Sequence, residues 1–209
     1  MNYKSTQAGR TMIEVMGYMA AVMAIVAGVS KIISGAYTEY KISKASLQLS
    51  DLAGAIVKAS TVDANYEEVV NMIKGSSSLS NHRRSEGLKL IPTSYRVVKK
   101  NNTNNIYHAF GGEVSVSIPT ESGMSDKFAI TFSGLSREQC IELGMKEWIN
   151  NKIVDLYAMI VNQKDYWYWP IYASDGSALP ATRSALAGAS VDDQGQCSRT
   201  SNQITWIFN

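Results

Sequence analysis

The chain has 209 residues, of which 45% are hydrophobic and 18% charged, and its formal net charge is +2. This length accommodates one domain of ordinary size with an additional segment, and the apolar content is sufficient for a core. The near-neutral charge, with no run of five like charges, does not indicate nucleic-acid binding or an acidic tail.

An apolar segment of membrane length runs from Met12 to Ile33 and contains one carboxylate, Glu14, near its start. A secretory signal peptide would explain the basic residues before it, and the alanines between residues 20 and 27 offer weak cleavage sites. A single-pass anchor would explain the length, since roughly 20 apolar residues cross a bilayer. Neither interpretation explains Glu14, because an acid in a membrane helix needs a partner.

A third interpretation takes Gly9 and Glu14 together. The stretch Gly9-Arg10-Thr11-Met12-Ile13-Glu14 resembles the start of type IV pilin precursors, in which a short basic leader ends in Gly and Glu is the fifth mature residue. The resemblance implies cleavage between Gly9 and Arg10 by a prepilin peptidase and N-methylation of Arg10. Members of this family usually have Phe, Met or Leu where Arg10 stands. Cleavage would create an amine one helical turn from Glu14, so a neighbouring subunit's amine could neutralise this acid in an assembly salt bridge.

The apolar segment is predicted to continue as one helix, because no Pro occurs between residues 11 and 60. Its second half carries apolar residues at spacings of three and four, namely Ala45, Leu49, Leu52, Ile56 and Ala59. We therefore expect this half to pack on the remainder of the chain. Asn65 is a predicted N-cap for a short helix that extends to about Ile73 and stops at Gly75.

The following stretch is predicted to be mostly irregular. Residues 76–87, which include His82, Arg83 and Arg84, are expected to form an exposed loop. Residues 88–90 and 95–98 are expected to be extended, and residues 101–105 to form a turn.

Alternating residues predict a sheet in the second half of the chain. Residues 113–118 and 128–132 are expected to pair as neighbouring strands, and residues 153–161 and 204–208 to add two more. Ser136-Arg137-Glu138-Gln139 is a capping box for a helix that carries Cys140, Leu143 and Trp148. Cys140 and Cys197 are too far apart in sequence for the CxxC motifs of zinc or thioredoxin-like redox sites. Because they follow a segment that indicates export, the simplest interpretation is one disulfide, and the alternative is two separate buried thiols. A disulfide would tie this helix to the edge of the C-terminal sheet.

This order of elements, which begins with Phe110-Gly111-Gly112 before the first alternating strand, is similar to that of type IVb pilins. The resemblance implies an α+β fold, with a long N-terminal helix whose apolar half protrudes and whose amphipathic half packs on an antiparallel sheet, and with one disulfide. It implies a leader over residues 1–9, a transmembrane or filament-core helix over 10–35 and a globular head over 36–209. It also implies a precursor in the bacterial inner membrane, assembly machinery and an extracellular homo-oligomeric filament.

No enzyme, cofactor or metal site is predicted. His82 and His108 lack companions at metal-ligand spacing, and Asp175, Asp192 and Asp193 more often solvate turns than bind calcium. The aromatic run at residues 166–170 is either an adhesive patch or, as we favour, an edge packed over the sheet. A minor pilin, a secretion pseudopilin and an anchored extracytoplasmic binding module are the alternatives to a filament subunit.

Overall fold

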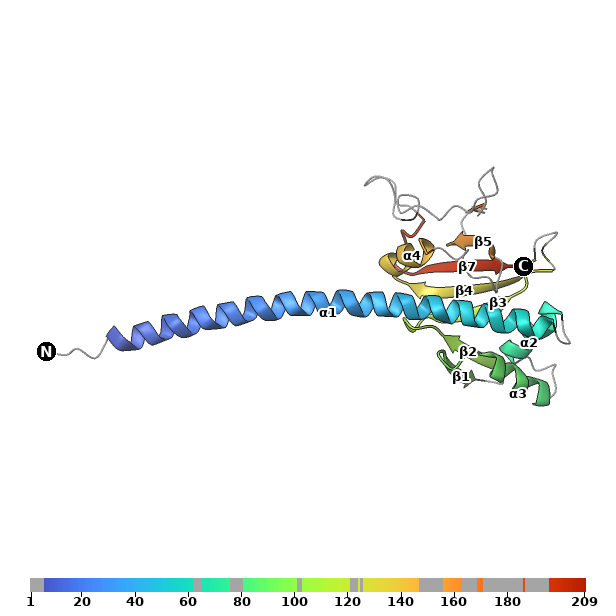
Figure 1. Cartoon of the computed structure of the whole chain (residues 1–209), viewed down its shortest axis with the longest axis horizontal. Helices are drawn as coiled ribbons and strands as arrows, with labels where there is room; N and C mark the ends of the chain where they lie inside the picture. The colour runs from blue at the N-terminus through green and yellow to red at the C-terminus, as the bar shows by residue number, and fades with distance from the viewer. Residues whose placement is uncertain are drawn as a thin grey trace. The chain divides into compact units, whose positions relative to one another are not determined.

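A computed structural model describes the fold (Figure 1) over residues 6–61, 65–75, 81–100, 103–120, 124, 126–146, 156–162, 169–170, 186 and 196–209. Its first element, α1 (Thr6–Ser60), is one continuous helix of 55 residues. The contacts divide the chain into two units, Met1–Lys41 and Ile42–Asn209. The first unit consists of the N-terminal part of α1, and the second contains the rest of that helix and a sheet.

The second half of α1 buries the predicted apolar stripe. Ala45, Leu49, Leu52 and Ile56 are completely buried, and Ala59 is half-buried. Ala53 is also completely buried, which widens the stripe, while Leu47 on another side is 65% exposed. The helix is therefore amphipathic over this half because its core-facing side alone packs against the sheet.

Two short helices follow α1. In α2 (Tyr66–Lys74), Asn65 Oδ1 accepts from the Glu68 backbone N–H, and Gly75 ends the helix with φ +71°, as predicted. The third helix, α3 (Asn81–Leu90), includes residues 81–87, which were predicted to be a loop, and residues 88–90, which were predicted to be extended. The remainder of the predicted loop, residues 76–80, lies outside the described residues. Its sequence is too polar to show the apolar spacing that predicts a helix. Packing against α2 therefore provides stability that the helix propensity of these residues does not. Gly87 makes this possible, because a Cβ there would clash with the Met72 backbone.

Within the described residues the sheet has seven antiparallel strands in the order β1-β2-β3-β4-β7-β5-β6. They are β1 (Arg96–Lys100), β2 (Thr103–Tyr107), β3 (Glu113–Ser117), β4 (Phe128–Leu135), β5 (Leu156–Val161), β6 (Trp169–Pro170) and β7 (Asn202–Phe208). The predicted pairing of β3 with β4 is confirmed, with Val114 opposite Phe132 and Val116 opposite Ile130.

Three details of the sheet differ from the prediction. Residues 103–105, expected in a turn, belong to β2, where Asn104 donates through Nδ2 to the Ile73 carbonyl. Asn is common in turns, so the sequence alone predicted a turn here, and the buried hydrogen-bond partner that places Asn104 in a strand is visible only in the structure. β6 was not predicted. Strand β7 lies between β4 and β5, so the C-terminal strand is interior to the sheet and not at its edge.

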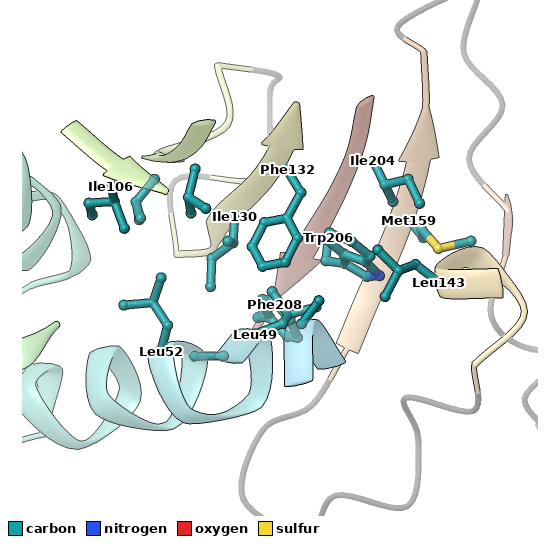
Figure 2. Close-up of a cluster of buried hydrophobic side chains, with 14 of the residues drawn as sticks. Leu49, Leu52, Ile106, Ile130, Phe132, Leu143, Met159, Ile204, Trp206 and Phe208 are labelled. Carbon is teal, nitrogen blue, oxygen red and sulfur yellow. The ribbon is translucent and has the colours of Figure 1, made fainter. Parts of the chain in front are cut away.

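The core lies between α1 and one face of the sheet, and α4 (Arg137–Gly144) extends it (Figure 2). The capping box at Ser136 and Gln139 is present, as predicted. Phe132 packs edge-on against Trp206, with ring centroids 5.3 Å apart, and Trp206 is completely buried. The core side chains labelled in Figure 2 come from α1, α4 and four strands, namely Leu49, Leu52, Ile106, Ile130, Phe132, Leu143, Met159, Ile204, Trp206 and Phe208. The fold is thus α+β, as predicted.

Candidate functional site

The N-terminal part of α1 exposes an unusual amount of apolar surface. Thirteen large apolar side chains between Met12 and Ile33 are 39–75% exposed. Full burial of a side chain of this size contributes at least about 1.5 kcal/mol, so burying all of them would contribute on the order of 20 kcal/mol. By length and composition this helix could cross a membrane, with a mean hydropathy of 1.9 in a window near the N-terminus. A surface of this kind requires lipid or other helices around it.

Glu14 lies on this apolar helix with its side chain exposed. The backbone of Gly9 and Arg10 is also helical, which places Arg10 four residues, or about 6 Å of helix axis, before Glu14. A new amine at Arg10 would therefore lie about one turn from the Glu14 carboxylate. The structure thus places Gly9, Arg10 and Glu14 near the same end of one helix.

Hydroxyl groups further along the same helix bond within it. Ser30 Oγ donates to the Val26 carbonyl at 2.8 Å, and Thr38 Oγ1 donates to the Ser34 carbonyl at 3.0 Å. These bonds satisfy the hydroxyls without water, as an apolar environment requires. Gly17, Gly28 and Gly35 have no atoms near the position of a Cβ, so neighbouring helices have room to approach there.

The two cysteines form the predicted disulfide. Cys140 of α4 is bonded to Cys197, with Cα atoms 5.8 Å apart, and both residues are completely buried. The Cys197 backbone N–H donates to the Leu186 carbonyl at 2.8 Å, and the buried Leu186 side chain lies against Gly144. The bond therefore fastens α4 to the segment that leads into β7.

A buried amide pair supports the same region and was not predicted. Asn162 Nδ2 donates to Asn202 Oδ1 at 2.8 Å, while Asn202 Nδ2 donates to the carbonyls of Leu135 and Arg199. Asn162 has φ +59°, a left-handed conformation that Asn tolerates better than most residues. These bonds join the ends of β4, β5 and β7. Because Asn is common in loops, the sequence around Asn162 and Asn202 does not indicate that the two side chains form a buried pair.

The turn between β2 and β3 is organised by His108 and by two glycines. His108 Nδ1 accepts from the Phe110 N–H, so the neutral ring donates through Nε2 to the Ser133 carbonyl at 2.9 Å. Burial lowers the pKa of His108, while the hydrogen bond to Ser133 opposes this shift. Gly111 has φ +89°, and a Cβ on Gly112 would clash with Ser133 and with the imidazole. This geometry explains why Gly111 and Gly112 both occur in the motif.

Gln48 of α1 connects this turn to the start of the sheet. Its Oε1 accepts from the Ala109 N–H at 2.8 Å, and its Nε2 donates to the Ser94 carbonyl at 2.6 Å. Gln48 is 1% exposed. This contact was not predicted, although a single polar residue in the apolar stripe of α1 was an available signal for it.

Other candidate sites are only partly described. Within the described residues there is no group of three or more His, Cys, Asp or Glu that could hold a metal ion. Asp175, Asp192, Asp193, Trp148 and residues 163–168 lie outside the described residues, as do the side chains of His82, Trp169 and Pro170. The aromatic run therefore contributes only the backbone pairing of β6 with β5.

Comparisons with known proteins identify the family. Residues 86–209, more than half of the chain, match the family described as PilS N terminal. No curated protein matches the sequence. Among solved structures, a type IV b pilin from Salmonella typhi is similar, with 13% identity, a TM-score of 0.42 and coverage of 78% of this chain and 97% of that chain. Taken with the long apolar helix, the antiparallel sheet and the disulfide, the family match shows that the chain belongs to the PilS family of type IV pilins.

Proposed function

We propose that this chain is a structural subunit, of the type IVb class, which polymerises into an extracellular type IV pilus. A prepilin peptidase would cut the precursor between Gly9 and Arg10 in the bacterial inner membrane, and Arg10 would become the N-methylated terminus. Assembly machinery would then extract the subunit from the membrane into a filament of identical copies. We assign no enzymatic activity, cofactor or metal to it.

The observation that carries this proposal is the exposed apolar half of α1. Thirteen large apolar side chains over Met12–Ile33 need a nonaqueous environment, first in lipid and then among the helices of other copies. The head supplies the folded, disulfide-bonded remainder. A membrane-anchored binding module would also have an apolar N-terminal helix, but anchoring alone does not require Glu14 within that helix.

Glu14 distinguishes the filament subunit from the anchor. An acid inside a membrane helix costs about 3 kcal/mol on insertion scales, which is small beside the apolar contribution of the whole segment. The helix therefore inserts despite Glu14. A filament packing that leaves Glu14 unpaired would be disfavoured by a similar amount, roughly a hundredfold in population. Pairing with a neighbour's terminal amine thus favours one axial offset between subunits.

Replacement of Glu14 tests this proposal. Glu14→Ala should insert into the membrane as well as the unmodified chain, because it removes a charge from the apolar segment. It should nevertheless yield few filaments, because the offset between subunits is no longer specified. Glu39→Ala is the matched control, since Glu39 is exposed on the same helix beyond the apolar segment. Shearing cells and weighing the released filaments measures the yield; normal yield from Glu14→Ala would refute the pairing.

A further inference from the structure

Two exposed tyrosines follow the apolar part of α1. Tyr37 and Tyr40 are 58% and 60% exposed, and Lys41 Nζ lies 4.7 Å from the centre of the Tyr37 ring. Because an α-helix turns by about 100° per residue, these three side chains leave α1 within about 100° of one another. Glu39, the acid between them, lies on the opposite side of the helix. We call Tyr37, Tyr40 and Lys41 the tyrosine belt.

The surroundings of the belt are typical of a boundary between lipid and water. Tyr is enriched at this boundary, because its ring has an apolar body and a polar tip. Residues 31–44 contain three Lys and one Glu, so their charge is complementary to phospholipid phosphates. Residues 34–36, which precede the belt, are Ser, Gly and Ala. Since these residues are small and uncharged, the hydrocarbon can extend as far as the belt.

The belt matches the height of one headgroup layer. Tyr37 and Lys41 are four residues apart, which is about 6 Å of helix axis, and a headgroup layer is about 5–8 Å thick. With the belt in this layer, the hydrocarbon ends at Ala36, and its thickness of about 30 Å extends roughly 20 residues back, to Gly17. Lys31 lies inside this span, but it is exposed, and its flexible side chain can snorkel to the headgroups.

This depth decides the environment of the other end of α1. Glu14 would lie about 4 Å beyond the hydrocarbon, and the Gly9–Arg10 bond about 11 Å beyond it. A bilayer centred on the apolar segment Met12–Ile33 would instead cover Glu14 and leave the bond only about 5 Å outside. The two placements differ by about four residues, or 6 Å of helix axis.

We propose that the tyrosine belt binds the phospholipid headgroups at the outer surface of the inner membrane and thereby sets the depth of the precursor. This inference rests on the proposed function, because it gives the belt a role before processing and assembly. The belt would hold the Gly9–Arg10 bond in water at the cytoplasmic surface, where a peptidase can reach it. It would also keep the Glu14 carboxylate hydrated until the subunit leaves the membrane, which lowers the cost of this acid in the precursor.

A cysteine placed at Val15 in the full-length precursor measures the depth. With the belt in place, Val15→Cys lies just outside the hydrocarbon on the cytoplasmic side. Adding Tyr37→Gln, Tyr40→Gln and Lys41→Gln should move residue 15 about 4 Å into the hydrocarbon, because Gln prefers water to the headgroup layer. In inverted membrane vesicles without prepilin peptidase, labelling by a membrane-impermeant maleimide should then fall about tenfold, because the reactive thiolate is disfavoured in hydrocarbon. The two native cysteines are bonded and buried.

Two control variants make the test specific. Tyr37→Trp with Tyr40→Trp and Lys41→Arg retains the rings and the cation, and it should label like the unmodified belt. Leu47→Gln with Lys58→Gln changes two exposed residues of the same helix outside the belt, and it should also label normally. In cells that contain the peptidase, pulse labelling should show slower cleavage of the triple Gln variant than of either control.

The outcomes separate this inference from the proposed function. An unmodified chain that is never cut between Gly9 and Arg10 would refute the proposed function, whereas the labelling of residue 15 would still test the belt. Equal labelling with and without the three Gln substitutions would refute the belt. An equal decrease in the control that changes Leu47 would also refute it. Normal labelling and cleavage together with loss of filaments would assign the tyrosines to contacts between copies and refute the lipid contact.

Discussion

Loss of the Cys140–Cys197 disulfide should substantially destabilise the head. The bond closes a loop with a sequence separation of 57. On the chain-entropy estimate, a crosslink over that distance stabilises the folded state by about 4 kcal/mol. In a protein of this size 1 kcal/mol shifts the melting temperature by about 2–4 °C, so removal of the bond should lower it by roughly 8–16 °C.

The variant Cys140→Ala with Cys197→Ala isolates this effect. Alanine avoids leaving buried hydroxyl groups without partners at two completely buried positions. Thermal unfolding of the full chain in detergent, followed by near-ultraviolet circular dichroism, reports the head through Trp206 and its aromatic neighbours. Dithiothreitol should lower the melting temperature of the unmodified protein to that of the variant and leave the variant unchanged. A decrease below about 2 °C in both cases, the shift expected for only 1 kcal/mol, would refute the reasoning.

Three further substitutions test the head. In urea unfolding measured at several pH values, the unmodified protein should lose stability as the pH falls below about 6.5, because burial lowers the pKa of His108 in the folded state and the unfolded state therefore binds the proton first. This loss should stop once the folded ring also titrates. His108→Gln should remove the pH dependence, whereas the control His82→Gln should retain it. Gly112→Ala should cost about 1–3 kcal/mol in the same assay because of the clash with Ser133, while Gly35→Ala, whose Cβ meets no neighbour, should not destabilise the head. Asn202→Ala should cost about 1–3 kcal/mol, since it leaves the Leu135 and Arg199 carbonyls without this donor; an unchanged urea midpoint would contradict the role of the amide pair.

Local sequence signals predicted the elements whose stabilising contacts are themselves local. The capping box at Ser136, the N-cap at Asn65 and the left-handed Gly75 each act within a few residues, and all three lie where the sequence predicts them. The apolar stripe of α1 is similarly visible as a period. The disulfide was expected from the combination of an export segment with two cysteines.

Elements that depend on distant partners were not predicted. Helix α3 is polar, and its position depends on the close approach of Gly87 to Met72. Strand β7 is interior because β5 pairs with it on the side away from β4, and nothing in the sequence of β7 indicates this pairing. Gln48 and His108 acquire their roles only when α1, the β2–β3 turn and β4 come together. Their residue types are compatible with many other positions.

Glu14 is the most informative residue of the chain, because its spacing from Gly9 is the feature that resembles type IV pilin precursors and on which the proposed filament assembly depends.

The most direct test of the central claim is the mass of the N-terminal peptide from filaments sheared off cells. The account predicts a mature chain that begins with N-methylated Arg10 and lacks residues 1–9. An intact Met1 terminus would indicate an unprocessed anchor, and a terminus near Ala27 would indicate a cleaved signal peptide. Either result would contradict the account.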